Sequence, residues 1–146
     1  MLGALPLSTL ISRGTVLEAL VDKEHLDDPA ISSRQKFIVL LNCGPSDPIY
    51  FAFLTSNTTK FDTLPHLKRE LMDVDHNAYD FLDRPTCLDF SDVHTMSMAA
   101  LEKMLTRKRL SYKGKLSDSD IVRCGTAIKG SFQIAPDIMR ALRCPP

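Results

Sequence analysis

Apolar runs separated by polar turns occupy the first part of the chain and predict β-strands. Residues 14–21, GTVLEALV, combine β-branched side chains with alternating polarity, which is typical of a strand. Residues 36–42, KFIVLLN, are almost wholly apolar, and residues 49–56, IYFAFLTS, follow them after the turn CGPSDP. Because the prolines and glycine of that turn cannot continue a hydrogen-bond ladder, the two runs are predicted to pair as an antiparallel hairpin. The acidic residues 22–33, DKEHLDDPAISS, predict a long loop before the hairpin.

The middle of the chain has a less regular pattern. Residues 64–83 fit one helical turn followed by a short strand near 79–82, and further short strands are predicted at 85–90 and 92–96. From there the apolar side chains recur at three and four residues. This spacing predicts an amphipathic helix over 97–107, with the serine at its first position as the N-cap.

The last part of the chain is predicted to be mainly helical. Residues 110–115 form a connection or a short strand, and Ser117 is the expected N-cap of the next helix. Asp118 and Asp120 then lie in its first turn, where negative charge suits the helix dipole. The expected buried stripe of this helix consists of Ile121, Cys124, Ile128 and Phe132. A final short helix is predicted over 136–143, where proline takes a first-turn position.

Strands first and helices later indicate the α+β class, with a strongly curved antiparallel sheet or a small barrel. The chain has 146 residues, of which 44% are hydrophobic and 25% charged, and these values suit one globular domain over 1–146. We expect residues 1–13 to be loosely ordered, 14–96 to be mainly β and 97–146 to be mainly helical.

Charge and hydropathy narrow the classes of function. The formal net charge is zero, which argues against a protein that coats nucleic acid through its overall charge, although a local basic patch is compatible with it. No apolar run approaches the roughly 20 residues that span a bilayer. The first 13 residues contain Pro6 and have no basic region before their apolar part, so no secretory signal and no membrane association are expected. A cytoplasmic protein is predicted.

The four cysteines stand singly in the sequence, at Cys43, Cys87, Cys124 and Cys144. No CxxC pair or nearby CxxxH occurs among them, so their spacing supports neither a zinc site nor a disulfide framework. They are predicted to be reduced and to serve as small buried hydrophobes. No metal and no other cofactor is expected.

The order of these segments resembles that of the MazF/PemK/Kid toxins of toxin–antitoxin systems. The resemblance covers residues 14–132 and rests on GTVL in the first strand, RQKFIVLLN and FLTS in the hairpin, VHT in a later strand, and KGKLSDSD before a C-terminal helix. It implies an SH3-like small antiparallel β-barrel with C-terminal helices. It also implies a homodimer that cleaves single-stranded RNA without a metal and is bound by a cognate antitoxin protein.

Carried over position by position, the resemblance implies that Arg34 is the catalytic arginine and Thr55 the catalytic threonine, with Ser56 beside it. Metal-free RNA cleavage removes a proton from the ribose 2′-OH, stabilises charge on the phosphorane and protonates the leaving 5′-oxygen. A guanidinium binds phosphate bidentately, and hydroxyls donate to phosphate oxygens without the burial of a second charge. Arg34 and Thr55 are expected to lie side by side at the ends of paired strands. The further residues expected to bind substrate are Lys36, Asn57, Thr58, Lys60, Asp89 and His94.

Several alternatives stay open at this stage. Lys36 competes with Arg34 for the cationic role, and the polar run after residue 54 is equally typical of a turn whose side chains bond their own backbone. The basic stretch 103–115 with Tyr112 could bind RNA or form a solvated helix face. The alternative function is a non-catalytic barrel module that binds RNA or a partner peptide in the same groove.

Overall fold

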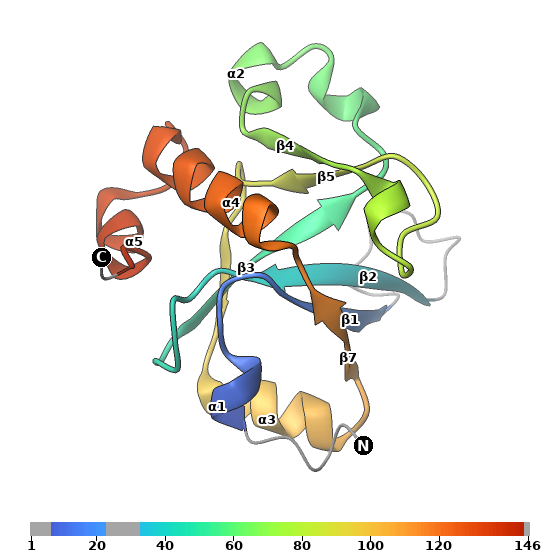
Figure 1. The fold of residues 1–146 in the computed structure, drawn as a ribbon, viewed down its shortest axis with the longest axis vertical. Coiled ribbons are helices and arrows are strands. Elements are labelled where there is room, and N and C mark those ends of the chain that lie inside the picture. Colours follow the sequence, from blue (N-terminus) through green and yellow to red (C-terminus); the bar gives the residue numbers. More distant parts are fainter. Residues whose placement is uncertain (1–6, 23–32, 145–146) are drawn as a thin grey trace.

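The computed structural model describes residues 7–22 and 33–144, and for 7–8, 20–22, 33–35 and 60 it describes the backbone alone. Seven strands form one antiparallel sheet in the order β4-β5-β3-β2-β1-β7, with β6 also paired to β3 (Figure 1). The strands are β1 (Thr15–Asp22), β2 (Ser33–Leu40), β3 (Ile49–Thr55), β4 (Leu71–Val74), β5 (Thr86–Asp89), β6 (His94–Met96) and β7 (Leu110–Lys115). The α+β class is therefore confirmed. Among the described strands the sheet is open, with β4 and β7 as its two ends.

The predicted hairpin is confirmed as β2 and β3, which pair antiparallel from Phe37 opposite Leu54 to Leu40 opposite Phe51. Both faces of this hairpin are covered. Val39 belongs to one cluster of buried side chains and Ile38 to a second, because successive strand residues point to opposite faces. The nearly continuous apolar run in the sequence follows from this double burial.

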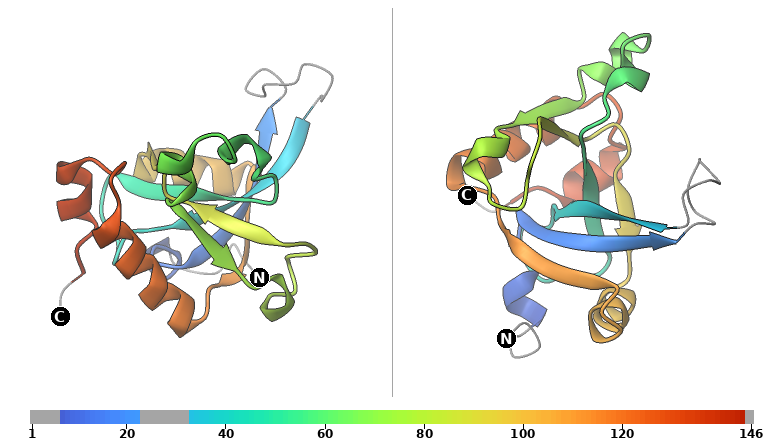
Figure 2. Two further views of the ribbon diagram at one scale, coloured as in Figure 1. Left: turned by 90° about the horizontal axis from the view of Figure 1, so that it is seen from above. Right: turned by 90° about the vertical axis from the view of Figure 1, so that its right-hand side faces the viewer.

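The described α-helices are α1 (Leu7–Leu10), α2 (Pro65–Lys68), α3 (Met98–Thr106), α4 (Asp118–Gly130) and α5 (Pro136–Ala141). Helices α3 and α4 cover opposite faces of the sheet (Figures 1 and 2). Cys124 and Ile128 of α4 lie in the first core cluster, whereas Leu101 of α3 lies in the second with Ile11, which follows α1. None of the described helices is both long enough and apolar enough to cross a membrane.

Local sequence signals place the helix starts correctly. The Ser97 hydroxyl accepts a hydrogen bond from the Ala100 N–H at 3.0 Å, and the Ser117 hydroxyl accepts one from the Asp120 N–H at 3.2 Å. Each bond satisfies one of the N–H groups that a helix start leaves without a partner. Pro136 opens α5, as its sequence position predicts.

Three parts of the chain differ from the expectation. Phe132, expected in the buried stripe of α4, lies beyond the end of that helix at Gly130 and is 73% exposed. Within 1–13, residues 1–6 lie outside the described residues, but Leu7–Leu10 form a helix, and Leu10 and Ile11 are buried. Residues 79–82 form no strand, although Tyr79 and Leu82 are buried there. The strand lies earlier, at Leu71–Val74, where Met72 and Val74 reach the core and the backbone pairs with β5.

The prediction of four reduced cysteines is wrong for two of them, since Cys43 and Cys144 form a disulfide. The partners are 101 residues apart in the sequence but their Cα atoms are 5.4 Å apart. The spacing of the cysteines in the sequence could not predict this disulfide, because only the tertiary fold brings the two residues together. Cys87 and Cys124 are free, and Cys124 is a buried core residue as predicted.

Cys124 makes the free energy of unfolding fall at alkaline pH. Burial raises the pKa of its thiol from 9.0 to about 11. The unfolded chain therefore releases this proton at a lower pH than the folded protein does. Stability is retained below about pH 9 and falls as the pH rises toward 11, by up to about 2–3 kcal/mol for a two-unit shift.

We expect Cys124→Ala to flatten this fall when urea unfolding is measured at intervals from pH 8 to pH 10.5. Part of the fall should remain, because burial and the Asp73 hydrogen bond also raise the pKa of the Cys87 thiol to about 11. The cavity that the substitution leaves lowers stability by the same amount at every pH. If the free energy of unfolding changes with pH in the same way in both proteins, the Cys124 thiol is not the cause of the fall.

Candidate functional site

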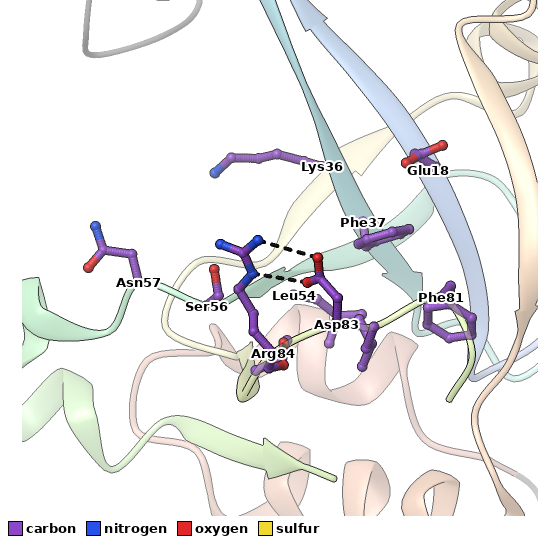
Figure 3. Close-up of a pocket in the computed structure, with 11 residues that line it drawn as sticks. Glu18, Lys36, Phe37, Leu54, Ser56, Asn57, Phe81, Asp83 and Arg84 are labelled. Atoms are coloured by element: carbon purple, nitrogen blue, oxygen red, sulfur yellow. Dashed lines mark hydrogen bonds and ion pairs between the residues drawn. The ribbon is translucent and has the colours of Figure 1, made fainter. Parts of the chain in front are cut away.

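A cleft of about 550 Å³ lies where β1, β2 and the end of β3 meet residues 81–86 (Figure 3). Its lining residues are Glu18, Lys36, Phe37, Leu54, Ser56, Asn57, Phe81, Leu82, Asp83, Arg84 and Thr86. The apolar members form a floor that continues into the first core cluster, in which Leu54 and Leu82 are buried. Ser56, Asn57 and Arg84 are exposed at the rim. An apolar floor with a few polar rim groups is the common form of a ligand site.

Two cations and two carboxylates line this cleft. The Arg84 Nε and Nη2 donate to the two carboxylate oxygens of Asp83 at 2.9 and 3.3 Å. This hydrogen-bonded pair lowers the pKa of Asp83 and raises that of Arg84. Both side chains are well exposed, so water weakens their attraction and a phosphate can compete for the guanidinium. The other carboxylate, of Glu18, lies 3.3 Å from Lys113 Nζ.

Lys36 lies beside Arg84 in the cleft. Figure 3 shows the Arg84 guanidinium between the Lys36 and Ser56 side chains. The Lys36 Nζ is also 4.9 Å from the centre of the Phe53 ring, within the range of a cation–π contact. The ring helps to fix the direction of the lysine, so one positive charge is held at this point of the rim.

Most of the polar run after Leu54 shapes a turn. The Thr55 hydroxyl donates to the Asn57 carbonyl oxygen at 3.3 Å, and the Asn57 Oδ1 accepts from the Thr59 hydroxyl at 2.7 Å. These are local bonds of the kind that such residues make in turns. Unlike the hydroxyls of Thr55 and Thr59, the Ser56 hydroxyl makes no hydrogen bond to any described residue, and Ser56 lines this cleft. Its hydroxyl is therefore available to a ligand in the cleft.

A second cleft of about 390 Å³ adjoins the first, and the two share Ser56 and Thr86. Its lining residues are Ser56, Thr58, Asp73, Val74, His76, Pro85, Thr86 and Cys87. The Cys87 thiol donates to Asp73 Oδ1 at 3.1 Å, and burial is the main reason that its pKa rises to about 11. That thiol is therefore neutral at pH 7 and a poor nucleophile. The shared residues make the two clefts one groove, which we call the double groove.

The strand register separates Arg34 from Thr55. The last β2–β3 pair is Phe37 opposite Leu54, so the same register continued by one residue sets Lys36 opposite Thr55. Arg34 lies two residues further along β2, roughly 7 Å at the usual rise of a strand, where its backbone pairs with Val21 of β1. Arg34 and Thr55 are therefore not directly opposite each other in the ladder, and the expectation that their side chains act on one phosphate stays a prediction. The Arg34 side chain is outside the described part of the chain.

The remaining predicted site residues are divided between the groove and other parts of the fold. Thr58 lines the second cleft, while the side chain of Lys60 is outside the described part of the chain. The Asp89 carboxylate accepts hydrogen bonds from the Ser91 N–H and hydroxyl at 2.8 and 2.5 Å. Asp89 therefore holds a turn and lines neither cleft.

His94 also lies outside the double groove. Its ring stacks on Phe51 with the ring centres 5.4 Å apart, and its Nε2 lies 3.3 Å from a carboxylate oxygen of Asp92. The aromatic contacts of His94 belong to the sheet face that carries the second core cluster, in which Phe51 is a peripheral member.

Sequence reasoning missed Arg84 and its neighbour Asp83. A signal was present in DRPT, residues 83–86, where a charged pair stands directly before a proline and a strand. A proline at a strand start marks the point where the chain enters a sheet, and a charged pair there lies along the side of the sheet where strands begin and end. Only the tertiary fold shows that this edge borders the end of β3.

Tyr79 anchors the segment that carries Asp83 and Arg84. Its hydroxyl donates to Asp120 Oδ2 at 2.5 Å and accepts from the Ser117 N–H at 2.9 Å. Burial, with the Asp120 hydrogen bond, raises the pKa of Tyr79. Arg123 donates to the other Asp120 oxygen at 2.8 Å, so the carboxylate of this buried residue is paired on both sides. The wall of the double groove is thereby tied to the start of α4.

No protein-family model matches this chain, and no curated protein matches it either. Within the described residues, no group of three or more His, Cys, Asp or Glu side chains is arranged to hold a metal ion. The functional argument therefore depends on the residues of the double groove.

Proposed function

We propose that this protein is a metal-independent endoribonuclease of the toxin type, which cleaves single-stranded RNA and leaves 2′,3′-cyclic phosphate ends. The observation that carries the proposal is the convergence of Lys36, Arg84 and Ser56 at one rim of the double groove. Two cations match a phosphodiester, together with the Ser56 hydroxyl, which makes no hydrogen bond to any described residue. The order of strands and helices supports the same proposal through its resemblance to the MazF/PemK/Kid toxins.

The groove's dimensions suit a flexible polymer. The two clefts of about 550 and 390 Å³ meet at Ser56 and Thr86, so adjacent nucleotides can occupy adjacent clefts. The apolar floor with Phe37 and Phe81 offers ring faces to an unstacked base. A double-stranded RNA helix keeps its bases paired and stacked and cannot use such a floor.

The chemistry is an attack by the ribose 2′-oxygen on the adjacent phosphorus. The 2′-hydroxyl gives up its proton to a base as the O2′–P bond forms, the P–O5′ bond breaks, and the 5′-oxygen takes up a proton as it leaves. Lys36 and Arg84 stabilise the charge that grows on the phosphoryl oxygens, and Ser56 donates a hydrogen bond to one of them. His76, which lines the second cleft, is the side chain assigned in this proposal to accept the first proton and to return it to the leaving oxygen.

The resemblance adds further expectations to the proposal. Arg34 and Thr55 act with the groove residues, with the Arg34 guanidinium on the scissile phosphate. The resemblance implies that this open antiparallel sheet is related to the SH3-like barrel, that the active form is a homodimer in the cytoplasm, and that an antitoxin protein covers the groove.

The test is incubation of the purified protein with a mixed single-stranded RNA in excess EDTA, followed by mass analysis of the ends. We expect cleavage with 2′,3′-cyclic phosphate at one end and a 5′-hydroxyl at the other. Ser56→Ala, purified in the same way, should be slower and so separates this activity from a contaminating nuclease. Cleavage that needs added metal, or equal rates for both proteins, would contradict the proposal.

A second candidate is a non-catalytic module that binds RNA or a peptide in the double groove. It is favoured by the Arg84–Asp83 pair, because a guanidinium held by its own carboxylate is less available for transition-state charge. RNA binding in the same buffer without any cleavage supports this module over the enzyme.

A further inference from the structure

A separate cavity of about 580 Å³ lies between α4, α5 and the turn before β1. It is lined by Arg13, Gly125, Ile128, Lys129, Met139, Leu142, Arg143 and Cys144, and we call it the basic cavity. It shares no lining residue with the double groove. The disulfide from Cys144 to Cys43 closes the chain beside it.

Among the described residues that line the basic cavity, three are cationic and none is acidic. Within the described residues, neither Arg13, Lys129 nor Arg143 has a carboxylate within ion-pair distance. Arg13 is half-buried, and its guanidinium donates to the backbone oxygens of Leu41 and Leu142. Those carbonyls satisfy hydrogen bonds but do not neutralise the charge. Removing an uncompensated cation from water costs free energy, which a bound anion would offset.

The rest of the lining is apolar. Ile128 and Leu142 are members of the first core cluster, and Met139 packs against it. Gly125 has no side chain, so the face of α4 is open at this point. A Cβ there would lie 3.4 Å from Arg13 Nη1 and would occupy part of the space beside the guanidinium. A ligand in this space would meet positive charge at the Arg13 side and methylenes elsewhere.

We propose that the basic cavity binds a small organic anion with an acidic head group and an apolar body, of the kind exemplified by a medium-chain carboxylate. The volume lies within the usual range for small-molecule sites. The head group pairs with the cationic side chains of Arg13, Lys129 and Arg143, and the apolar body packs on Met139 and its neighbours.

The test compares decanoate, below its micelle concentration, with decyltrimethylammonium and acetate by isothermal titration calorimetry on the full chain. Decanoate is expected to bind at one saturable site. The cation with the same tail, and the acid without a tail, should each bind at least tenfold more weakly. Equal binding of the two amphiphiles, or no decanoate binding, would overturn the proposal.

Substitutions in and near the basic cavity test whether decanoate binds there. Gly125→Leu fills the cavity and should remove decanoate binding, whereas Gly130→Leu, at the end of the same helix, adds its side chain to open space and should not. Lys129→Glu reverses an exposed charge and should weaken binding at least tenfold even if Gly125→Leu does not fold. Binding unchanged by both Gly125→Leu and Lys129→Glu, with circular dichroism showing folded proteins, would also overturn the proposal.

Discussion

Replacing Arg84 by alanine is expected to lower the rate of RNA cleavage by about 10² to 10³, the usual cost of losing one donor to a charged transition state. Arg84 lines the cleft beside Lys36 and Ser56, and its exposed pair with Asp83 can exchange for a phosphate. Single-turnover cleavage of a fluorescent RNA in EDTA measures the rate. Arg84→Lys should recover only part of it, because an ammonium lacks the bidentate geometry of a guanidinium.

The matched control is Arg140→Ala, which removes an exposed arginine of α5 that lines neither cleft. Its cleavage rate should equal that of the unmodified protein. Arg34→Ala tests the arginine that the resemblance assigns, and loss of cleavage there with a folded protein supports a shared role. If Arg84→Ala cleaves at the normal rate, the groove rim is not the site of phosphate stabilisation.

Loss of the Cys43–Cys144 bridge is expected to have the largest effect on stability. In the chain-entropy description, a bridge closing a loop of about 100 residues stabilises the folded state by about 4–5 kcal/mol. The bridge also connects the end of the chain, beyond α5, to the turn between β2 and β3. Urea unfolding of Cys144→Ser, or of the unmodified protein in a thiol reductant, should show this loss as a lower transition midpoint.

Cys87→Ser is the matched control, because Cys87 is a free thiol and serine can keep the bond to Asp73. Its stability should stay close to that of the unmodified protein. Mass spectrometry of an unreduced digest should yield the peptide pair joined through Cys43 and Cys144. A midpoint that is the same with and without reductant would show that the bridge is absent or contributes little. Such bridges are rare in proteins of reducing compartments such as the cytosol, so the result also tests the proposed cytoplasmic location.

The strong elements of the fold were predictable because each follows from a local signal. The β2–β3 hairpin has apolar runs separated by a proline-containing turn, and α3 and α4 have serine caps followed by periodic apolar residues. The weak elements had no such signal. Strand β4 is four residues long, and its place depends on which alternate side chains reach the core.

The limits of sequence reasoning are clearest at the disulfide and the groove. Cys43 and Cys144 meet through the packing of α5 on the sheet, a contact with no counterpart in local spacing. Lys36, Ser56 and Asn57 were proposed from the hairpin and do line the first cleft. Arg84 comes from another part of the chain, so only the pairing of β5 with β3 brings it there.

The floor of the first cleft consists partly of side chains that hold the core together, notably Leu54 and Leu82. Substitutions that reshape the floor should therefore lower the melting temperature and alter ligand preference together. Rim residues such as Asn57 are exposed and carry little of the packing. Natural or engineered diversification of ligand preference should accumulate first along the rim, with the floor changing only when compensating substitutions restore the packing beneath it.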